Sequence, residues 1–288
     1  MASAALALTA CGGGVLNPQG PVGAADMTIL IDSLVIMLAI VVPTLLAVLG
    51  VAWWFRASNE RARYRPQWAF SGRVELVVWA IPLMVIVLLG GVAWLGAHAL
   101  DPAEPLGPAE DTLDVQVVSL DWKWLFIYPK QGVASINRLV IPAGVPVRFA
   151  LTSSSVMNAF FVPQLGSMIY TMNGMTSHLN LKANAPGTFA GLSAHYSGDG
   201  FSDMHFEVRA LAADQFTAWV DATRASGPAL DETAYAALRR QTLAVPASTY
   251  ASVDARLFEK IVALELEPGP GPATKHRGAI QVPAEQGH

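Results

Sequence analysis

The sequence predicts a membrane-anchored all-β protein in which a two-helix transmembrane hairpin precedes a β-sandwich with C-terminal helices. Three observations predict this fold class. The chain of 288 residues is 53% hydrophobic and only 14% charged, which is too apolar for an average soluble domain. Two long runs in the first hundred residues carry no charged side chain. Short β-type runs separated by turn residues follow them, and the pattern then turns helical.

Charge and cysteine content exclude several classes of function. The formal net charge of −4 includes no basic excess that could neutralise phosphates, so we expect no nucleic-acid partner. Cys11 is the only cysteine of the chain. The chain therefore forms no intrachain disulfide, and it cannot build a metal site that needs two thiolates.

The N-terminus resembles a bacterial lipoprotein signal. An apolar run ends in Leu8-Thr9-Ala10-Cys11, which resembles the lipobox that is cut before a lipid-modified cysteine. This pattern predicts a signal peptide over residues 1–10, lipidation of Cys11 and a periplasmic segment over residues 11–33. Ten residues are few for a signal peptide and no Lys or Arg precedes the run, so a chance cysteine among small residues is the alternative.

Two uncharged runs predict the transmembrane hairpin, over residues 34–100. Leu34 to Phe55 and Leu76 to Ala97 each give 22 residues, long enough at helical rise to cross a hydrocarbon core about 30 Å thick. Each run contains a proline, Pro43 or Pro82, which a membrane bundle tolerates. A pair of buried core helices in a soluble protein is the alternative.

The flanking charges predict the orientation of the hairpin. The loop over residues 56–73 contains one acidic residue, Glu60, and five arginines: Arg56, Arg61, Arg63, Arg65 and Arg73. The stretch after the second run is acidic and contains Asp101, Glu104, Glu110, Asp111 and Asp114. Because basic loops stay in the cytoplasm, we expect this loop to be cytoplasmic and both termini to be periplasmic.

The exported part is expected to begin with a sandwich over residues 112–210. Runs such as Leu113–Val118 and Arg138–Ile141 recur at the spacing of an antiparallel sandwich. Residues 211–266 show helical periodicity, and the helices could pack on the sandwich or on a neighbouring subunit. Residues 267–288 are rich in Pro, Gly and polar residues and are predicted to be a flexible tail.

Three segments carry a resemblance to a known family. They are Asp121-Trp122-Lys123-Trp124, the stretch from Thr152 to Pro163, and the stretch from Ala185 to Gly198. With the helical hairpin, they resemble subunit II of the haem-copper oxidases, in the ubiquinol oxidase branch of the cytochrome bo type. The resemblance runs to about residue 263, and it implies that the sandwich is cupredoxin-like.

The copper site of the family provides a discriminating comparison. Cytochrome c oxidases hold a dinuclear copper centre in this domain with two cysteines, two histidines, a methionine and a backbone carbonyl. At the matching positions this chain has Asn158 and Phe201 for the histidines, Ser193 and Ser197 for the cysteines, His195 at the carbonyl donor, and Met204. A serine hydroxyl ionises too reluctantly to replace a bridging thiolate, so we expect no metal and no cofactor in this chain.

The resemblance implies a non-redox subunit II of a proton-pumping terminal quinol oxidase, which couples ubiquinol oxidation to the reduction of oxygen to water. Haem and copper are then expected in subunit I, and subunits III and IV complete the complex. The resemblance also implies that ubiquinol is the substrate of the complex and that cytochrome c is not a partner. The chain is expected to cross the bacterial inner membrane twice, with its C-terminal domain in the periplasm. Two alternatives stay open: a cytochrome c oxidase subunit, and a free-standing lipoprotein with a binding sandwich.

Glu75 is the candidate site residue that the resemblance assigns. It opens the second uncharged run, at a position that resembles the glutamate at the entrance of the family's K proton channel. A carboxylate at the membrane boundary can take a proton from water and pass it inward. The alternative is an ordinary interfacial charge that pairs with Arg73.

Other conspicuous residues receive structural interpretations. Trp122 and Trp124 are expected to be alternate residues of a strand that fill the core or an interface, and Asp32 an interfacial cap. Three histidines without metal-ligand spacing are expected to be surface or hydrogen-bonded residues: His178, His195 and His205. Four methionines are expected to fill the core or an interface: Met157, Met168, Met172 and Met175.

Overall fold

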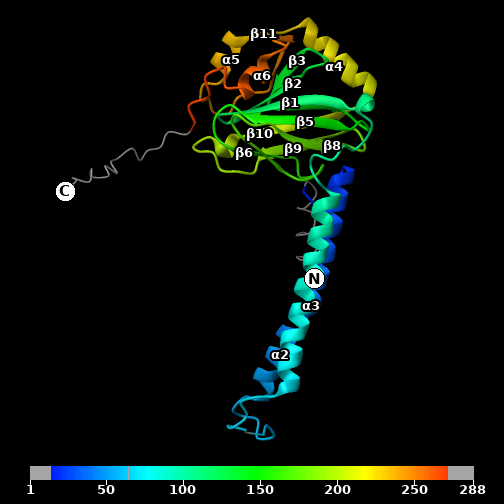
Figure 1. The fold of residues 1–288 in the computed structure, drawn as a ribbon, viewed down its shortest axis with the longest axis vertical. Helices are drawn as coiled ribbons and strands as arrows, with labels where there is room; N and C mark the ends of the chain where they lie inside the picture. The colour runs from blue at the N-terminus through cyan, green and yellow to red at the C-terminus, as the bar shows by residue number, and fades with distance from the viewer. Residues whose placement is uncertain (1–13, 64, 272–288) are drawn as a thin grey trace, which may run out of the picture. The chain divides into compact units, whose positions relative to one another are not determined.

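The computed structural model describes residues 14–63 and 65–271, which fall into two compact units (Figure 1). One unit is a helical pair within Ala24–Asp101, and the other comprises the described residues up to Gly23 and from Pro102 to Gly271. The predicted signal peptide and Cys11 lie outside the described residues.

The helical unit contains α2 (Pro21–Trp54) and α3 (Gly72–Ala99), both long and apolar enough to cross a membrane. α2 begins thirteen residues before the uncharged run, because Pro21 suits the first position of a helix. Asp32 therefore lies about three turns inside α2, and its assignment as a cap is wrong. The two helices pack closely at Gly96, where a Cβ atom would lie 2.7 Å from Cδ1 of Ile29.

The second unit is a sandwich of two sheets. The six-stranded sheet has the order β12-β3-β2-β1-β5-β8 and the five-stranded sheet the order β4-β10-β9-β6-β7. The strands of the first sheet are β1 (Leu113–Leu120), β2 (Lys123–Tyr128), β3 (Val133–Ile136), β5 (Val147–Ser153), β8 (Ser177–Leu181) and β12 (Ser248–Tyr250). Those of the second are β4 (Arg138–Pro142), β6 (Asn158–Phe161), β7 (Ile169–Thr171), β9 (Gly187–Ser193) and β10 (His205–Leu211).

The sheets are mixed, which differs from the antiparallel sandwich that the sequence predicts. β1 pairs in parallel with β5, and β10 pairs in parallel with β4. The chain between β1 and β5 crosses to the other sheet at β4, so it returns beside β1 in the same direction. A short alternating run predicts a strand, but it does not predict which strand it pairs with or in which direction.

Aromatic rings fill the space between the two sheets. Phe160 of β6 stacks on Phe206 of β10 with ring centroids 5.1 Å apart, and the Trp124 ring of β2 lies 5.4 Å from Phe160. The Tyr128 hydroxyl of β2 accepts a hydrogen bond of 2.8 Å from the backbone N–H of Val140 in β4. This bond joins the two sheets directly.

A second core lies on the outer face of the six-stranded sheet, where the C-terminal elements pack (Figure 1). These elements are β11 (Ala229–Leu230), α5 (Glu232–Leu238), β13 (Ser252–Val253) and α6 (Leu257–Val262). The helix α4 (Ala213–Ala225) instead adds Phe216 and Val220 to the core between the sheets, and η2 (Ala109–Asp111) precedes β1. Leu125 and Ile127 of β2 pack there with Tyr235 of α5 and Phe258 of α6. Both faces of β2 are therefore covered, and every residue of this strand is buried.

The C-terminal part differs from the sequence prediction in two ways. It is not entirely helical, because β11, β12 and β13 lie among its helices, and β12 extends the six-stranded sheet. The first residues of the predicted tail are bound to the sandwich. The Gly269 N–H donates to the carbonyl of Ser154 at 2.8 Å, and the Gly271 N–H donates to Oδ2 of Asp121 at 3.0 Å.

Candidate functional site

The positions that match copper ligands converge at one end of the five-stranded sheet. Asn158 begins β6 and Ser193 ends β9, while His195 and Ser197 lie in the loop that follows. Phe201 begins the short helix η3 (Phe201–Asp203), and Met204 precedes β10. Backbone pairing holds the two segments together, because the Ser193 N–H donates to the carbonyl of Met204 at 3.1 Å.

The side chains at these positions hydrogen-bond to one another. The Ser193 hydroxyl lies 3.2 Å from Oδ1 of Asn158 and 3.3 Å from the carbonyl oxygen of His195. The Ser197 hydroxyl points at the Met204 sulfur, 3.9 Å away. Asn158, Ser193, Ser197 and Met204 are all buried. These positions thus form a small, internally bonded polar cluster, and its donors and acceptors face protein groups.

The donor set does not fit a dinuclear copper centre. The hydroxyls at Ser193 and Ser197 replace soft bridging ligands, and Phe201 offers no donor atom. A lone thioether such as Met204 is a weak ligand. Within residues 14–63 and 65–271, no three His, Cys, Asp or Glu side chains gather in a group that could hold a metal ion.

The three histidines lie apart from one another. His195 packs edge-on against Tyr170 with ring centroids 5.9 Å apart. His178 lies on β8 and His205 on β10, in different sheets, and both are exposed. Among the methionines, Met157, Met168 and Met175 are more than a third exposed, so they do not fill the core.

Trp122 supports the loop of the polar cluster from a turn. It follows β1 with a φ of +65°, a left-handed conformation that is uncommon outside glycine, so it is not the strand residue that the sequence predicts. The side chain is buried, and its indole N–H donates to the carbonyl of Ser197 at 3.1 Å. Gly200 lies against the indole ring, where a Cβ atom would overlap with it. Trp124 lies on β2 in the core, as predicted.

Two charged residues beside this turn are buried, which the sequence analysis did not anticipate. Lys123 is 1% exposed, and its ammonium group donates to the carbonyl of Arg240 at 2.7 Å and to the Thr242 hydroxyl at 2.5 Å. Burial lowers the pKa of Lys123 to about 8, against the opposing attraction of Asp121. Asp121 accepts hydrogen bonds from Ser155 and Gly271. The only sequence signal is that these two charges stand within an apolar run.

Glu75 lies in the first turn of α3, as the sequence indicates. Its carboxylate accepts a hydrogen bond of 3.1 Å from the indole N–H of Trp79, one turn further along. In the part of the chain that the structure describes, no ion pair joins Glu75 to Arg73. The carboxylate borders a largely apolar hollow of about 500 Å³, which is also lined by Phe70 and Leu83.

Comparisons with known proteins agree with this architecture. The family described as "Cytochrome C oxidase subunit II, periplasmic domain" matches residues 115–211, and the "COX Aromatic Rich Motif" matches residues 224–269. The "Ubiquinol oxidase subunit 2" of Acetobacter aceti is 46% identical over 91% of this chain and 85% of its own length. The "Cytochrome bo(3) ubiquinol oxidase subunit 2" of Pseudomonas aeruginosa is 42% identical over 99% of this chain and 87% of its own length.

The chain belongs to the ubiquinol oxidase subunit 2 family. As a ubiquinol oxidase subunit 2, it is a component of a ubiquinol oxidase complex. A solved structure, the periplasmic domain of cytochrome oxidase subunit II of Bradyrhizobium japonicum, aligns with a TM-score of 0.37 and 24% identity. That alignment covers 38% of this chain and 91% of the other chain.

Proposed function

We propose that this chain is the non-redox, copper-free subunit of a proton-pumping terminal quinol oxidase. In such a complex, ubiquinol oxidation is coupled to the reduction of oxygen to water, with the haems and copper in subunit I. One observation supports this assignment most directly: at the copper positions, Ser193 is buried and hydrogen-bonded to Asn158 at 3.2 Å. Without an electron acceptor in the sandwich, reduced cytochrome c has no entry point here. A membrane-soluble quinol must then deliver electrons to subunit I.

The same proposal includes the membrane topology of the chain, its partner subunits and its lipid anchor. The chain crosses the inner membrane twice and presents its sandwich to the periplasm, because the arginine loop favours the cytoplasm. Subunit I is the direct partner, and subunits III and IV belong to the same complex. Cys11 carries a lipid at the periplasmic surface, because it follows the segment that resembles a lipobox.

Metal analysis of this chain separated from subunit I tests the copper-free assignment. We expect a copper-to-chain ratio near zero and no visible absorption, and the intact complex should oxidise ubiquinol but not reduced cytochrome c. Stoichiometric copper in the separated chain, or rapid oxidation of cytochrome c, would contradict the proposal. If this chain purified from membranes without any haem-bearing subunit, the result would instead favour a free-standing lipoprotein.

We further propose that Glu75 admits protons from the cytoplasm. Its carboxylate stands at the first turn of the second span, on the side where the arginine loop lies. Its hydrogen-bond partner is the neutral indole of Trp79, and no cation among the described residues forms an ion pair with the carboxylate. A carboxylate at this boundary can exchange protons with water and then with groups deeper in the membrane.

Replacing Glu75 by glutamine tests this role. Glu75→Gln keeps the size and the acceptor for Trp79 but removes the proton-exchanging group, so quinol oxidase turnover should fall several-fold while haem content stays normal. Glu75→Asp should be milder. Glu60→Gln, which changes the charge of the adjacent loop equally, should turn over at the normal rate. Normal turnover of Glu75→Gln across a range of pH, in a fully assembled complex, would reduce Glu75 to an interfacial charge.

A further inference from the structure

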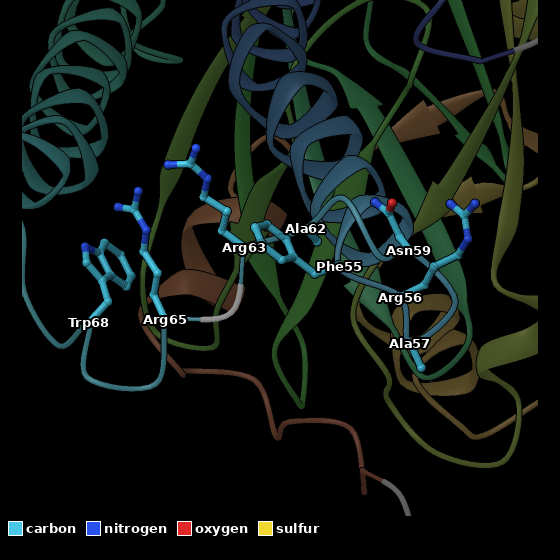
Figure 2. Close-up of a pocket in the computed structure, with 8 residues that line it drawn as sticks. All are labelled: Phe55, Arg56, Ala57, Asn59, Ala62, Arg63, Arg65 and Trp68. Atoms are coloured by element: carbon cyan, nitrogen blue, oxygen red, sulfur yellow. The ribbon is translucent and has the colours of Figure 1, made fainter.

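The loop between the two spanning helices encloses a hollow of about 550 Å³ (Figure 2). Three arginines line it, Arg56, Arg63 and Arg65, together with the Asn59 amide and the rings of Phe55 and Trp68. Figure 2 shows the Arg63 and Arg65 side chains extending in the same direction beside the Trp68 ring, with Arg56 and Asn59 on the other side.

The arginines of this hollow have unused hydrogen-bonding capacity. Arg56 donates to the carbonyl of Trp53 at 2.9 Å and to the Ser58 hydroxyl at 3.0 Å, and its guanidinium lies over the Trp53 ring at 4.8 Å. Among the described residues, none accepts a hydrogen bond from the guanidinium groups of Arg63 or Arg65, and neither forms an ion pair. Each guanidinium carries five donors in a planar fork, which matches the oxygens of a phosphate.

The depth of the hollow favours a lipid as the source of that phosphate. Phe55 directly follows the end of α2, so the arginines stand just outside the hydrocarbon core, where the headgroup layer is about 5–8 Å thick. Aromatic side chains at the end of α2 and in the loop are exposed, namely Trp53, Trp54, Phe55, Trp68 and Phe70. Exposed aromatic rings are typical of the interface between lipid tails and headgroups. Lysines and arginines just outside a span attract anionic headgroups.

We propose that this hollow binds the phosphate of an anionic phospholipid, with Arg63 and Arg65 as its principal ligands and the Trp68 ring beside the upper acyl chain. An acidic surface of a partner subunit is the competing occupant. The lipid is favoured because the lining combines guanidinium groups with exposed rings at headgroup depth, whereas an acidic protein surface would not require the rings.

Lipid titration of the purified complex tests the proposal with variants of equal charge. Arg63→Gln/Arg65→Gln removes two arginines from the hollow. Arg61→Gln/Arg73→Gln removes two arginines of the same loop that do not line it. Each delipidated complex is titrated with dihexanoyl phosphatidylglycerol and binding is counted by native mass spectrometry. Dihexanoyl phosphatidylcholine and inorganic phosphate serve as separate arms.

We expect phosphatidylglycerol to bind the hollow variant about thirtyfold more weakly than the wild type, from the loss of two arginines at an anionic surface. The control variant should stay within about twofold, and phosphatidylcholine should bind all three complexes weakly. If phosphatidylglycerol bound both variants equally weakly, the attraction would depend only on the charge of the loop, and the proposed site would be wrong. Displacement of the lipid by equimolar inorganic phosphate would identify a free-phosphate site instead. Unchanged lipid binding with loss of a partner subunit from the hollow variant would assign the arginines to a protein contact.

Discussion

Replacing Tyr128 by phenylalanine should destabilise the sandwich by removing one hydrogen bond between its sheets. The tyrosine hydroxyl of β2 accepts the Val140 N–H of β4 at 2.8 Å, and both residues are buried. Phenylalanine keeps the ring, which lies 5.2 Å from Trp219 and 6.4 Å from Phe216, so no large cavity forms. The Val140 N–H is then left buried without an acceptor.

The size of the effect follows from that orphaned donor. A buried backbone group that loses its partner costs about 1–3 kcal/mol of unfolding free energy. For a domain of roughly this size, each kcal/mol lowers the midpoint of thermal unfolding by about 2–4 °C. The Tyr128→Phe midpoint should therefore fall by several degrees.

Thermal unfolding of the full chain in detergent, followed by near-ultraviolet circular dichroism, measures this shift, because that signal reports the aromatic core. Tyr250→Phe is the matched control, because its hydroxyl hydrogen-bonds to none of the described residues. Its midpoint should therefore change by less than about 1 °C. Equal midpoints for Tyr128→Phe and the wild type would show that the bond between the sheets contributes nothing. An equally large fall for Tyr250→Phe would show that any lost hydroxyl has the same effect.

Three further predictions concern the polar groups of the chain. The fourfold variant Asn158→His/Ser193→Cys/Ser197→Cys/Phe201→His restores the side chains of the copper site, so it should bind copper and absorb visible light. Ser193→Cys alone should do neither. Because burial lowers the pKa of Lys123 from 10.5 to about 8, the folded chain binds fewer protons than the unfolded chain between these values. Urea unfolding should thus show stability rising from about pH 8 to about pH 9.5, with a flatter profile for Lys123→Met. Mass spectrometry of the mature protein should find lipid on Cys11; an intact Met1 or a bare Cys11 would contradict this.

Sequence patterns predicted the parts of the fold that depend on composition. The two uncharged runs indicated both spanning helices, and Glu75 lies in the first turn of α3 as expected. The positions matched to copper ligands could be gathered only through the family resemblance, because 35 residues separate Asn158 from Ser193 and no local pattern joins them.

Local sequence patterns did not predict the features that depend on tertiary contacts. Nothing local to Trp122 signals a left-handed turn, because tryptophan rarely adopts positive φ. Distant contacts hold it there, namely the packing against Gly200 and the hydrogen bond to the Ser197 carbonyl. Lys123 reads as a solvent-facing charge, yet the loop at Arg240 and Thr242 covers it from more than a hundred residues away. The parallel pairing of β1 with β5 is likewise a property of the whole topology.

The mutual bonding of Ser193 and Asn158 has a consequence for the evolutionary history of this subunit. A single change of Ser193 to cysteine does not complete the ligand set, because the second thiolate and both histidines are still missing, yet it weakens the bond to a buried amide. Single changes of Ser197, Asn158 or Phe201 likewise complete no ligand set. The one-step change at Ser193 therefore begins with a loss, and substitutions in one such network depend strongly on each other. A first substitution at Ser193 costs stability and brings no metal binding in return, which favours the persistence of a lineage that draws its electrons from quinol.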